Sequence, residues 1–354
     1  MKKKVIVAGH ICLDITPIFP DKKVNTLSEI MIPGKLLQVE QADVHTGGAV
    51  ANTGLAMKLM GADVSLKGKV GEDAFGEMIL EILDKYEAKE GMLVSAEEST
   101  SYSVVLAVPG IDRIFLHNPG ANHSFKAADI SKEELEEATL LHFGYPPLMK
   151  SMYENEGQEL LLLMQKAKEA GCATSLDMAA IDADSEAGRM DWKVILRKVL
   201  PYIDYFVPSV EELCFMLDRE RFASWQKRAG DRDITEILDV DKDVKPLADM
   251  CMEYGAKTLL IKCGAPGIYY RTSEKEGFEK SYVPEKILSG TGAGDTCIAA
   301  FLVAMLEGYS LEDALHFAVA QGACCVAAYD ALSGLKTLPE LKVKIDSGWK
   351  KQEV

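Results

Sequence analysis

The sequence has no apolar run approaching the roughly 18 residues that a membrane helix needs. A short apolar segment follows the lysines at the N-terminus, but Gly9, His10 and Asp14 interrupt it before it reaches the length of a signal peptide. This segment instead predicts a first buried strand. We therefore expect a cytoplasmic protein with no role in a membrane.

The sequence also lacks the cysteine spacings of disulfide-rich and zinc-binding proteins. No two cysteines form a CxxC pair, and none has a histidine partner at zinc-site spacing. They are scattered, mostly among apolar neighbours, which indicates buried free thiols in a reducing compartment. The eight are Cys12, Cys172, Cys214, Cys251, Cys263, Cys297, Cys324 and Cys325.

No basic stripe is present, and the formal net charge is −16. Such a charge repels nucleic acid and anionic lipid, so neither is an expected partner. An anionic nucleotide can still bind, because oriented backbone N–H groups and a metal ion act locally. The composition is ordinary for a globular protein, with 48% apolar and 27% charged residues. We expect residues 1–354 to form one large α/β domain.

Short apolar runs alternate along the chain with segments of helical period. The runs are rich in β-branched residues, as in strands buried on both faces of a parallel sheet. The alternation predicts a three-layer α/β/α sandwich, with ligands at the carboxyl ends of the strands. The predicted strands cover residues 5–8, 140–143, 173–176, 205–207 and 258–261, and the predicted helices cover 49–60, 74–86, 156–170, 191–199 and 247–254.

Two stretches break this alternation, at about residues 15–44 and 100–118. In the second, runs at 103–108 and 111–116 flank a Pro109-Gly110 turn, which is typical of a hairpin. We predict that the two stretches form a small β-sheet lid over the substrate site; the alternative is an inert excursion at the sheet edge.

Two further segments carry less information. Residues 218–243 are rich in Arg, Asp and Glu, and are predicted to be a solvated insertion that adds little to function. The Lys-rich stretch 342–354 is predicted to be a terminal helix or a frayed end.

The strongest chemical signal is Gly290-Thr291-Gly292-Ala293-Gly294-Asp295, directly before a helix-compatible apolar run. Small residues let backbone N–H groups approach an anion, and a helix N-terminus favours negative charge. The segment lacks the Gly-Lys-[Ser/Thr] ending of a Walker A loop. We interpret Gly292, Ala293 and Gly294 as an anion hole for phosphoryl oxygens.

Asp295 has two interpretations. Aspartate is a common helix N-cap, which accepts hydrogen bonds from backbone N–H groups. Beside a phosphate cradle, it is also well placed to take the proton of a hydroxyl that attacks the γ-phosphate. The glycine-rich context favours the second interpretation, a catalytic base.

With these residues the chain resembles the PfkB family of ribokinase-like carbohydrate kinases, whose C-terminal signature is similar to Asp-Thr-x-Gly-Ala-Gly-Asp. Residues 292–295 match its last four positions, while Ser289 and Gly290 replace the first Asp and Thr. In the family the first Asp helps to bind a monovalent cation, so activation by K⁺ is left open here. The resemblance implies a ribokinase-like sandwich with a β-lid, ATP and Mg²⁺ as cofactors, and Asp295 as the base.

A second family-like signature, Gly47-Gly48-Ala49-Val50-Ala51-Asn52, lies far upstream. The glycines permit close backbone approach, and the Asn52 amide offers both a donor and an acceptor to adjacent hydroxyls. The resemblance also implies substrate contacts from Asp14, after the first strand, and from Asn122 in an Asn-Pro-Gly-Ala-Asn stretch. The alternatives are a structural turn at Gly47, a satisfied helix residue at Asn52, and ordinary polar turns at Asp14 and Asn122.

Two elements further along resemble the nucleotide side of the family's site. Ser209 and Glu212 resemble an Asn-x-x-Glu element, in which Glu212 would help to hold hydrated Mg²⁺; the alternative is an exposed acid in a first helical turn. Gly264 and Gly267 resemble a strand-end Gly-x-x-Gly turn near the nucleotide.

The resemblance implies transfer of the ATP γ-phosphoryl group to a hydroxyl of a small unphosphorylated sugar or sugar-like alcohol. A nucleoside kinase of the same family is the first alternative, and a non-catalytic sugar sensor is another. Sugar-phosphate substrates are disfavoured, because the segment 177–180 has no basic residue to bind a second phosphate. A nucleotide-binding dehydrogenase is a weak rival, because Gly9 does not begin a G-x-G-x-x-G motif. Lid strands offer a way to pair two subunits, so a homodimer and a monomer both stay open.

Overall fold

A computed structural model describes residues 4–21, 23–111 and 114–353. Its main element is an eight-stranded sheet in the order β14-β13-β12-β11-β10-β9-β1-β4. The strands from β4 to β12 are parallel, and β13 and β14 add an antiparallel edge. All five predicted strands are confirmed. The bounds are β1 (Lys4–Gly9), β4 (Asp63–Lys67), β9 (Leu140–Gly144), β10 (Ala173–Asp177), β11 (Tyr205–Phe206), β12 (Thr258–Lys262), β13 (Gly267–Arg271) and β14 (Glu276–Lys280).

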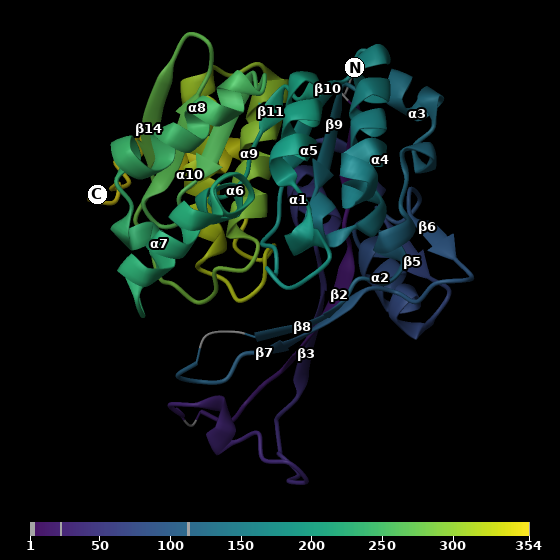
Figure 1. The fold of residues 1–354 in the computed structure, drawn as a ribbon, viewed down its shortest axis with the longest axis vertical. Helices are drawn as coiled ribbons and strands as arrows, with labels where there is room; N and C mark the ends of the chain where they lie inside the picture. The colour runs from purple at the N-terminus through teal and green to yellow at the C-terminus, as the bar shows by residue number, and fades with distance from the viewer. Residues whose placement is uncertain (1–3, 22, 112–113, 354) are drawn as a thin grey trace.

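Helices cover both faces of this sheet (Figure 1). Successive residues of β1 show why: Ile6 packs into one hydrophobic core, and Val5 and Val7 pack into the other. The three-layer α/β/α sandwich is therefore confirmed. One layer contains α3 (Lys132–Glu137), α4 (Lys150–Glu169), α5 (Trp192–Val199), α6 (Val210–Leu217), α7 (Arg219–Ala229) and α8 (Lys245–Glu253), and the other contains α1 (Ala49–Leu59), α2 (Ala74–Asp84), α9 (Ala293–Glu307), α10 (Leu311–Cys325) and α11 (Leu338–Asp346).

The five predicted helices are all present, with one local difference. Helix α4 starts at Lys150 rather than near residue 156, and its backbone leaves the helical region between Glu154 and Gly157. None of the helices in the described ranges is long and apolar enough to cross a membrane.

A separate four-stranded sheet, in the order β3-β2-β7-β8, projects from the body of the molecule (Figure 1). Its strands are β2 (Cys12–Pro17), β3 (Ala42–Gly47), β7 (Tyr102–Leu106) and β8 (Ile114–Asn118). The segment between β2 and β3 contacts the β7–β8 connection, where the Val24 N–H donates to the Pro109 carbonyl at 3.0 Å. The predicted small sheet and its hairpin are confirmed, while residues 112–113 of the hairpin lie outside the described residues. A further pair, β5 (Lys69–Gly71) and β6 (Leu93–Ser95), is parallel.

The stretch 218–243 differs from the prediction of a solvated insertion. It forms α7, and Trp225 on this helix is only 1% exposed. The Trp225 indole Nε1 donates to Asp243 at 2.9 Å, and Arg228 pairs with the same carboxylate at 3.0 Å. Most of the stretch is exposed as predicted, but Trp225, Ala229, Thr235 and Asp243 are buried, and the many charged residues concealed these anchors.

The carboxyl ends of the parallel strands meet along one edge of the sheet. Gly9 at the end of β1 pairs with Gly144 at the end of β9, and Gly144 pairs with Asp177 at the end of β10. At the end of β12, Lys262 forms a bridge with Ser209. Because β2 continues from the end of β1, the small sheet lies at this same edge.

Candidate active site

The glycine-rich loop leads directly into α9. Gly292 is the N-cap residue, with a left-handed φ of 73°, and a Cβ at this position would lie 2.3 Å from the Ala331 Cβ. Glycine is therefore required at this turn. No side chain among the described residues caps the helix. The Ala293 N–H donates to the Gly290 carbonyl at 3.3 Å, and the turn with Gly294 presents the positive end of the helix dipole to an anion.

Asp295 lies in the first turn of α9 and is only 4% exposed, but it is not the N-cap. Its carboxylate accepts hydrogen bonds from Asn52 Nδ2 at 3.0 Å, Tyr145 Oη at 2.7 Å and Thr53 Oγ1 at 3.4 Å. Asp295 is therefore not the cap of the helix. Two residues on α1 and one directly after β9 hold its side chain in one orientation.

Tyr145 directly follows β9 and has an unusual backbone. Its φ of 68° and ψ of 42° lie in the left-handed region, which is energetically costly for a residue with a side chain. Such strained backbone conformations are concentrated at functional sites. Burial and the neighbouring Asp295 raise the pKa of the Tyr145 phenol well above its usual value. Tyr145 therefore remains a neutral donor to the carboxylate.

A second group of residues near Asp295 consists of those predicted to bind the acceptor alcohol. A Cβ on Gly47 would lie 2.1 Å from Asp14 Oδ2, so glycine allows this carboxylate to lie against the backbone. Gly48 has a φ of 86°, and α1 follows it at once, bringing Asn52 to Asp295 one turn later. Burial raises the pKa of Asp14. The structure therefore links Asp14, Gly47, Gly48, Asn52 and Asp295 in one continuous region.

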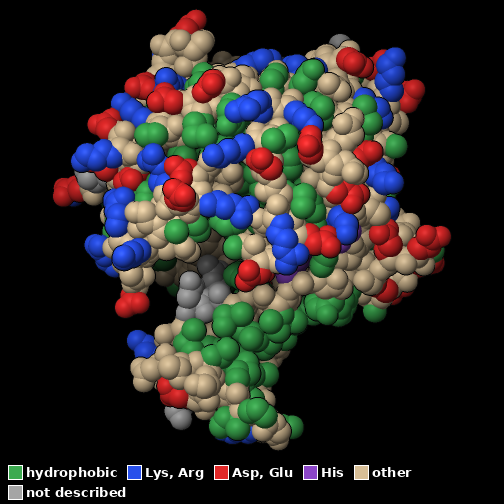
Figure 2. Space-filling view, in the orientation of Figure 1, with side chains coloured by type: hydrophobic (Ala, Val, Ile, Leu, Met, Phe, Trp, Pro, Cys, Tyr) green, Lys and Arg blue, Asp and Glu red, His purple; other side chains and the backbone are tan. Residues whose placement is uncertain are grey.

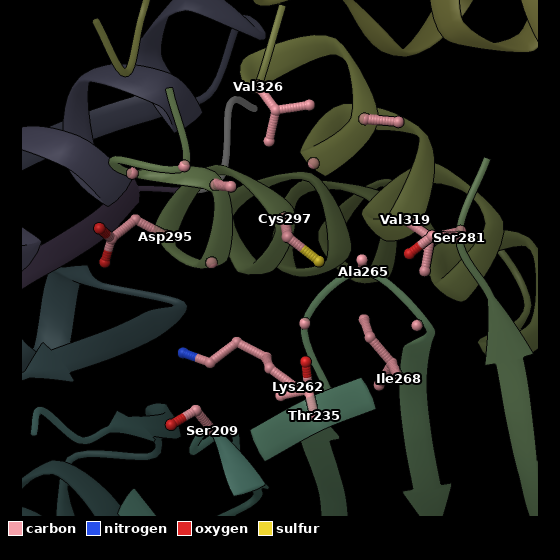
Figure 3. Close-up of a pocket in the computed structure, with 18 of the residues that line it drawn as sticks. Ser209, Thr235, Lys262, Ala265, Ile268, Ser281, Asp295, Cys297, Val319 and Val326 are labelled. Carbon is pink, nitrogen blue, oxygen red and sulfur yellow. The ribbon is translucent and has the colours of Figure 1, made fainter. Parts of the chain in front are cut away.

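Lys262 and Asp177 form a buried ion pair beside the anion hole. Lys262 Nζ lies 2.7 Å from each carboxylate oxygen of Asp177, which is fully buried. Burial lowers the pKa of Lys262, but Asp177, Glu212 and Asp295 outweigh this effect and raise it above the usual value. The lysine is thus a fixed cation, and its stem lies 3.4 Å from where a Gly294 Cβ would be. Figure 3 shows its side chain extending toward Asp295.

A cavity of about 610 Å³ opens on the other side of Asp295 (Figure 3). Gly264 and Gly267, with φ values of 66° and 141°, form the turn between β12 and β13 and line this cavity. Asp233 and Thr235 also line it, at the short helix Ile234–Ile237. Residues 218–243 therefore contribute two side chains to the cavity, which the sequence did not indicate.

Glu212 lines the same cavity near its charged end. Its Oε2 accepts from the Ser209 N–H at 2.8 Å, while the Ser209 hydroxyl accepts from the Glu212 N–H at 3.3 Å, which is a capping box. No second hydrogen bond holds the other oxygen, Oε1, within the described residues. Glu212 is therefore both a structural cap and a carboxylate available at the cavity.

Asn122 occupies a different position from the other predicted site residues. It is fully buried, its Oδ1 accepts from the Ile11 N–H at 3.1 Å, and its Nδ2 donates to the Ile11 carbonyl at 2.8 Å and the Pro119 carbonyl at 3.0 Å. These bonds hold the β1–β2 connection. They support a structural role and offer no free group to a substrate.

Four residues near Asp295 were absent from the prediction: Tyr145, Asp177, Lys262 and Thr53. The first three share a signal that the sequence does contain, because each is the last residue of a buried strand or the residue just after it. Polar side chains at that point of neighbouring parallel strands converge at one edge. Thr53 is the neighbour of Asn52 on α1.

Comparison with known proteins identifies the family. The model of the pfkB family carbohydrate kinases matches residues 2–338. The chain is a member of this family. A 5-dehydro-2-deoxygluconokinase from Clostridium beijerinckii is 24% identical over 96% of the chain and 92% of its own length, and a probable fructokinase-5 from Arabidopsis thaliana is 25% identical over 82% and 85%.

Solved structures agree with the fold of this pfkB family kinase. The structure of Arabidopsis thaliana ribokinase, complexed with ribose and ATP, aligns with a TM-score of 0.75 at 21% identity, over 97% of this chain and 98% of the other. The ribokinase-like architecture is thereby confirmed. As a pfkB family kinase the protein is a phosphotransferase with an alcohol group as acceptor, and it phosphorylates a sugar or sugar-like alcohol with ATP.

The contacts of Asn122 make a prediction about stability. Replacing Asn122 with Ala would leave the buried N–H and the buried carbonyl of Ile11 without partners. The free energy of unfolding should therefore fall by about 1–3 kcal/mol. Urea denaturation measures this change. The control is Asn25→Ala, an exposed residue between β2 and β3, which should stay within about 0.5 kcal/mol of the parent. Unchanged stability with a raised KM for the acceptor would instead show direct substrate binding.

Proposed function

We propose that Asp295 is the general base of this kinase and that it accepts the proton of a hydroxyl on a small, unphosphorylated sugar or sugar-like alcohol. One observation carries the proposal. Asp295 lies between the Asp14–Asn52 region and the large cavity, beside the N-terminus of α9. An alcohol on one side and a nucleotide on the other would meet at this carboxylate.

The two ends of the cavity differ in character, which orients the nucleotide. Near Asp295 the lining is charged and includes Lys262 and Glu212. The other end is lined by Ile268, Val319 and other apolar residues, as Figure 3 shows. An apolar end suits a nucleobase, and the charged end suits phosphates. ATP would therefore lie with its γ-phosphate at the anion hole.

The reaction then follows from the positions of the side chains. Asp14 and Asn52 orient the acceptor hydroxyls, and Asp295 takes the proton of the attacking hydroxyl. That oxygen forms a bond to the γ-phosphorus while the bond to the β–γ bridging oxygen breaks, and ADP leaves. The backbone N–H groups of Gly292, Ala293 and Gly294, with Lys262, stabilise the charge on the transferred phosphoryl oxygens.

The residues near the charged end fit Mg²⁺. This ion prefers one or two protein carboxylates together with waters and substrate phosphates. Glu212 supplies one carboxylate at the cavity, with one oxygen held by Ser209. Bound with the nucleotide, Mg²⁺ would neutralise phosphate charge. A monovalent cation near Ser289 and Gly290 remains open.

Several observations support a neutral sugar-like acceptor. The relatives are named as sugar kinases, and the ribokinase was solved with ribose. The segment 177–180 at the end of β10 contains no basic residue that could bind a phosphate on the substrate. A nucleoside acceptor is the alternative. The eight cysteines are all free and buried, which supports the reducing cytoplasm as the compartment.

The small sheet would act as the lid of this site and as a dimer contact. It lies at the carboxyl edge of the main sheet, where a lid can exclude water from the acceptor. Its outer strand β8 is an edge strand, and Phe115 and Leu116 on this strand are 57% and 54% exposed. Figure 2 shows apolar side chains gathered over this sheet. A second copy of the chain would cover this surface.

An acceptor panel tests the central proposal. The protein should release ADP from ATP with at least one neutral sugar or polyol and not with nucleosides. Asp295→Asn should lower kcat by about 10²–10⁴-fold with little change in ATP affinity, because only proton transfer is lost. Ser289→Ala is the control from the same loop. Near-normal turnover in the Asn variant would refute the assignment, and a preference for nucleosides would establish the alternative.

Replacement of Lys262 tests its role at the phosphoryl group. Lys262→Met keeps most of the side-chain volume but removes the cation, and kcat should fall about 10²–10³-fold while the KM for the acceptor changes little. Steady-state kinetics separates the two constants, and circular dichroism verifies folding. Lys257→Met is the control. This exposed lysine pairs with the partly buried Asp204, and neither residue lines the cavity. A normal kcat would contradict the assignment.

Sedimentation velocity tests the dimer. The wild-type protein should sediment as a dimer, and Phe115→Lys should shift it to a monomer by placing a charge in the apolar contact. The control Val94→Lys changes another exposed apolar residue, on β6 outside the lid, and should leave the dimer intact. A wild-type monomer at all tested concentrations would rule out this interface.

A further inference from the structure

The residues after α11 form an ordered tail that pairs with the chain beyond β14. The Val283 N–H donates to the Lys350 carbonyl at 2.9 Å, and the Gln352 N–H donates to the Ser281 carbonyl at 2.8 Å. Tyr282 and Lys351 form an antiparallel bridge between these bonds. The tail 349–352 therefore has a defined register against 281–283.

Side chains fix the tail in that register. Trp349 stacks on Tyr282 with a centroid separation of 4.7 Å and an interplanar angle of 22°, and its Nε1 donates to the Val283 carbonyl at 2.7 Å. Lys351 forms an ion pair with Glu279 and lies over the Tyr282 ring. Together these contacts restrain both the backbone and the side chains of the tail.

This register brings Gln352 to the large cavity, where it lines the wall together with Ser281 and Tyr282. Figure 3 places Ser281 next to Val319, at the end of the cavity opposite Asp295. The carboxamide of Gln352 is half-buried and has no hydrogen-bond partner among the described residues. Gln352 thus lines the cavity beside Ser281 and Tyr282, and none of the described residues pairs with its carboxamide.

The tail also lies outside the part of the chain that matches the family. That match ends at residue 338, the first residue of α11. The family match therefore says nothing about the wall that contains Gln352.

We propose that the tail 349–352 closes the base-binding end of the nucleotide cavity and that Gln352 is a specificity residue for the adenine of ATP. The proposal builds on the nucleotide orientation given above. A carboxamide has a donor and an acceptor side by side, and adenine presents its 6-amino group next to a ring nitrogen acceptor. Gln352 can form both bonds with this edge.

The test measures nucleotide binding by titration calorimetry, using ATP, purine riboside triphosphate and tripolyphosphate on the full-length protein. Gln352→Ala should weaken ATP binding about two- to tenfold, the range expected for lost neutral hydrogen bonds. Purine riboside triphosphate lacks the 6-amino group, so the preference of the wild type for ATP over this analogue should shrink in the variant. Tripolyphosphate has no base, and its affinity should not change.

The exposed neighbour Glu353 supplies a matched control, since Glu353→Ala should bind all three ligands as the wild type does. A chain that ends at Gly348 removes the whole tail, and should lose more ATP affinity than Gln352→Ala while it keeps its affinity for tripolyphosphate. Unchanged ATP binding in Gln352→Ala, or an equal loss for tripolyphosphate, would overturn the role of the tail alone. A wild-type protein that binds neither ATP nor tripolyphosphate would overturn the nucleotide site itself.

Discussion

The site depends on one buried contact, the 3.0 Å hydrogen bond between Asn52 on α1 and Asp295 on α9. The two residues are 243 positions apart, and they meet because both helices lie on the same face of the main sheet. Gly54 allows α1 to pack closely against that sheet, since a Cβ there would lie 2.2 Å from Leu66. The packing of apolar helix faces thus determines where the polar contact forms, and the contact fixes the carboxylate.

The sequence predicted those parts of the fold and site that have a local signature. Buried strands appear as short apolar runs, and the start of α9 appears as small residues before a helical run, so both were predicted from the sequence. Tyr145, Asp177 and Lys262 were missed because their meaning depends on strand order. Each lies at the end of a different strand, and only the arrangement β9, β10, β11, β12 brings them to one edge. Trp225 was missed because its charged neighbours dominate the local pattern.

The electrostatics of the site run against the charge of the whole protein. The chain carries a formal net charge of −16, yet it must hold a polyanionic nucleotide. The positive charge that compensates for this is confined to the site. Lys262 is only 14% exposed, and the nearby carboxylates of Asp177, Glu212 and Asp295 raise its pKa. Together with the N-terminus of α9, it places positive charge where our proposal puts the transferred phosphoryl group, in surroundings where water screens that charge weakly.

The position of the C-terminal tail 349–352 could not be predicted from the sequence, even with the strand order of the main sheet known. Its position rests on main-chain hydrogen bonds between 281–283 and 350–352, and such bonds leave no trace in residue type. The side chains that support it, Trp349 on Tyr282 and Lys351 with Glu279, pair residues that are ordinary in isolation. The lysine-rich end 342–354 was predicted to be a terminal helix or a frayed end; α11 confirms a helix as far as Asp346, and the tail beyond it forms a wall. In this chain, contacts of this kind place a wall at the end of the cavity opposite Asp295.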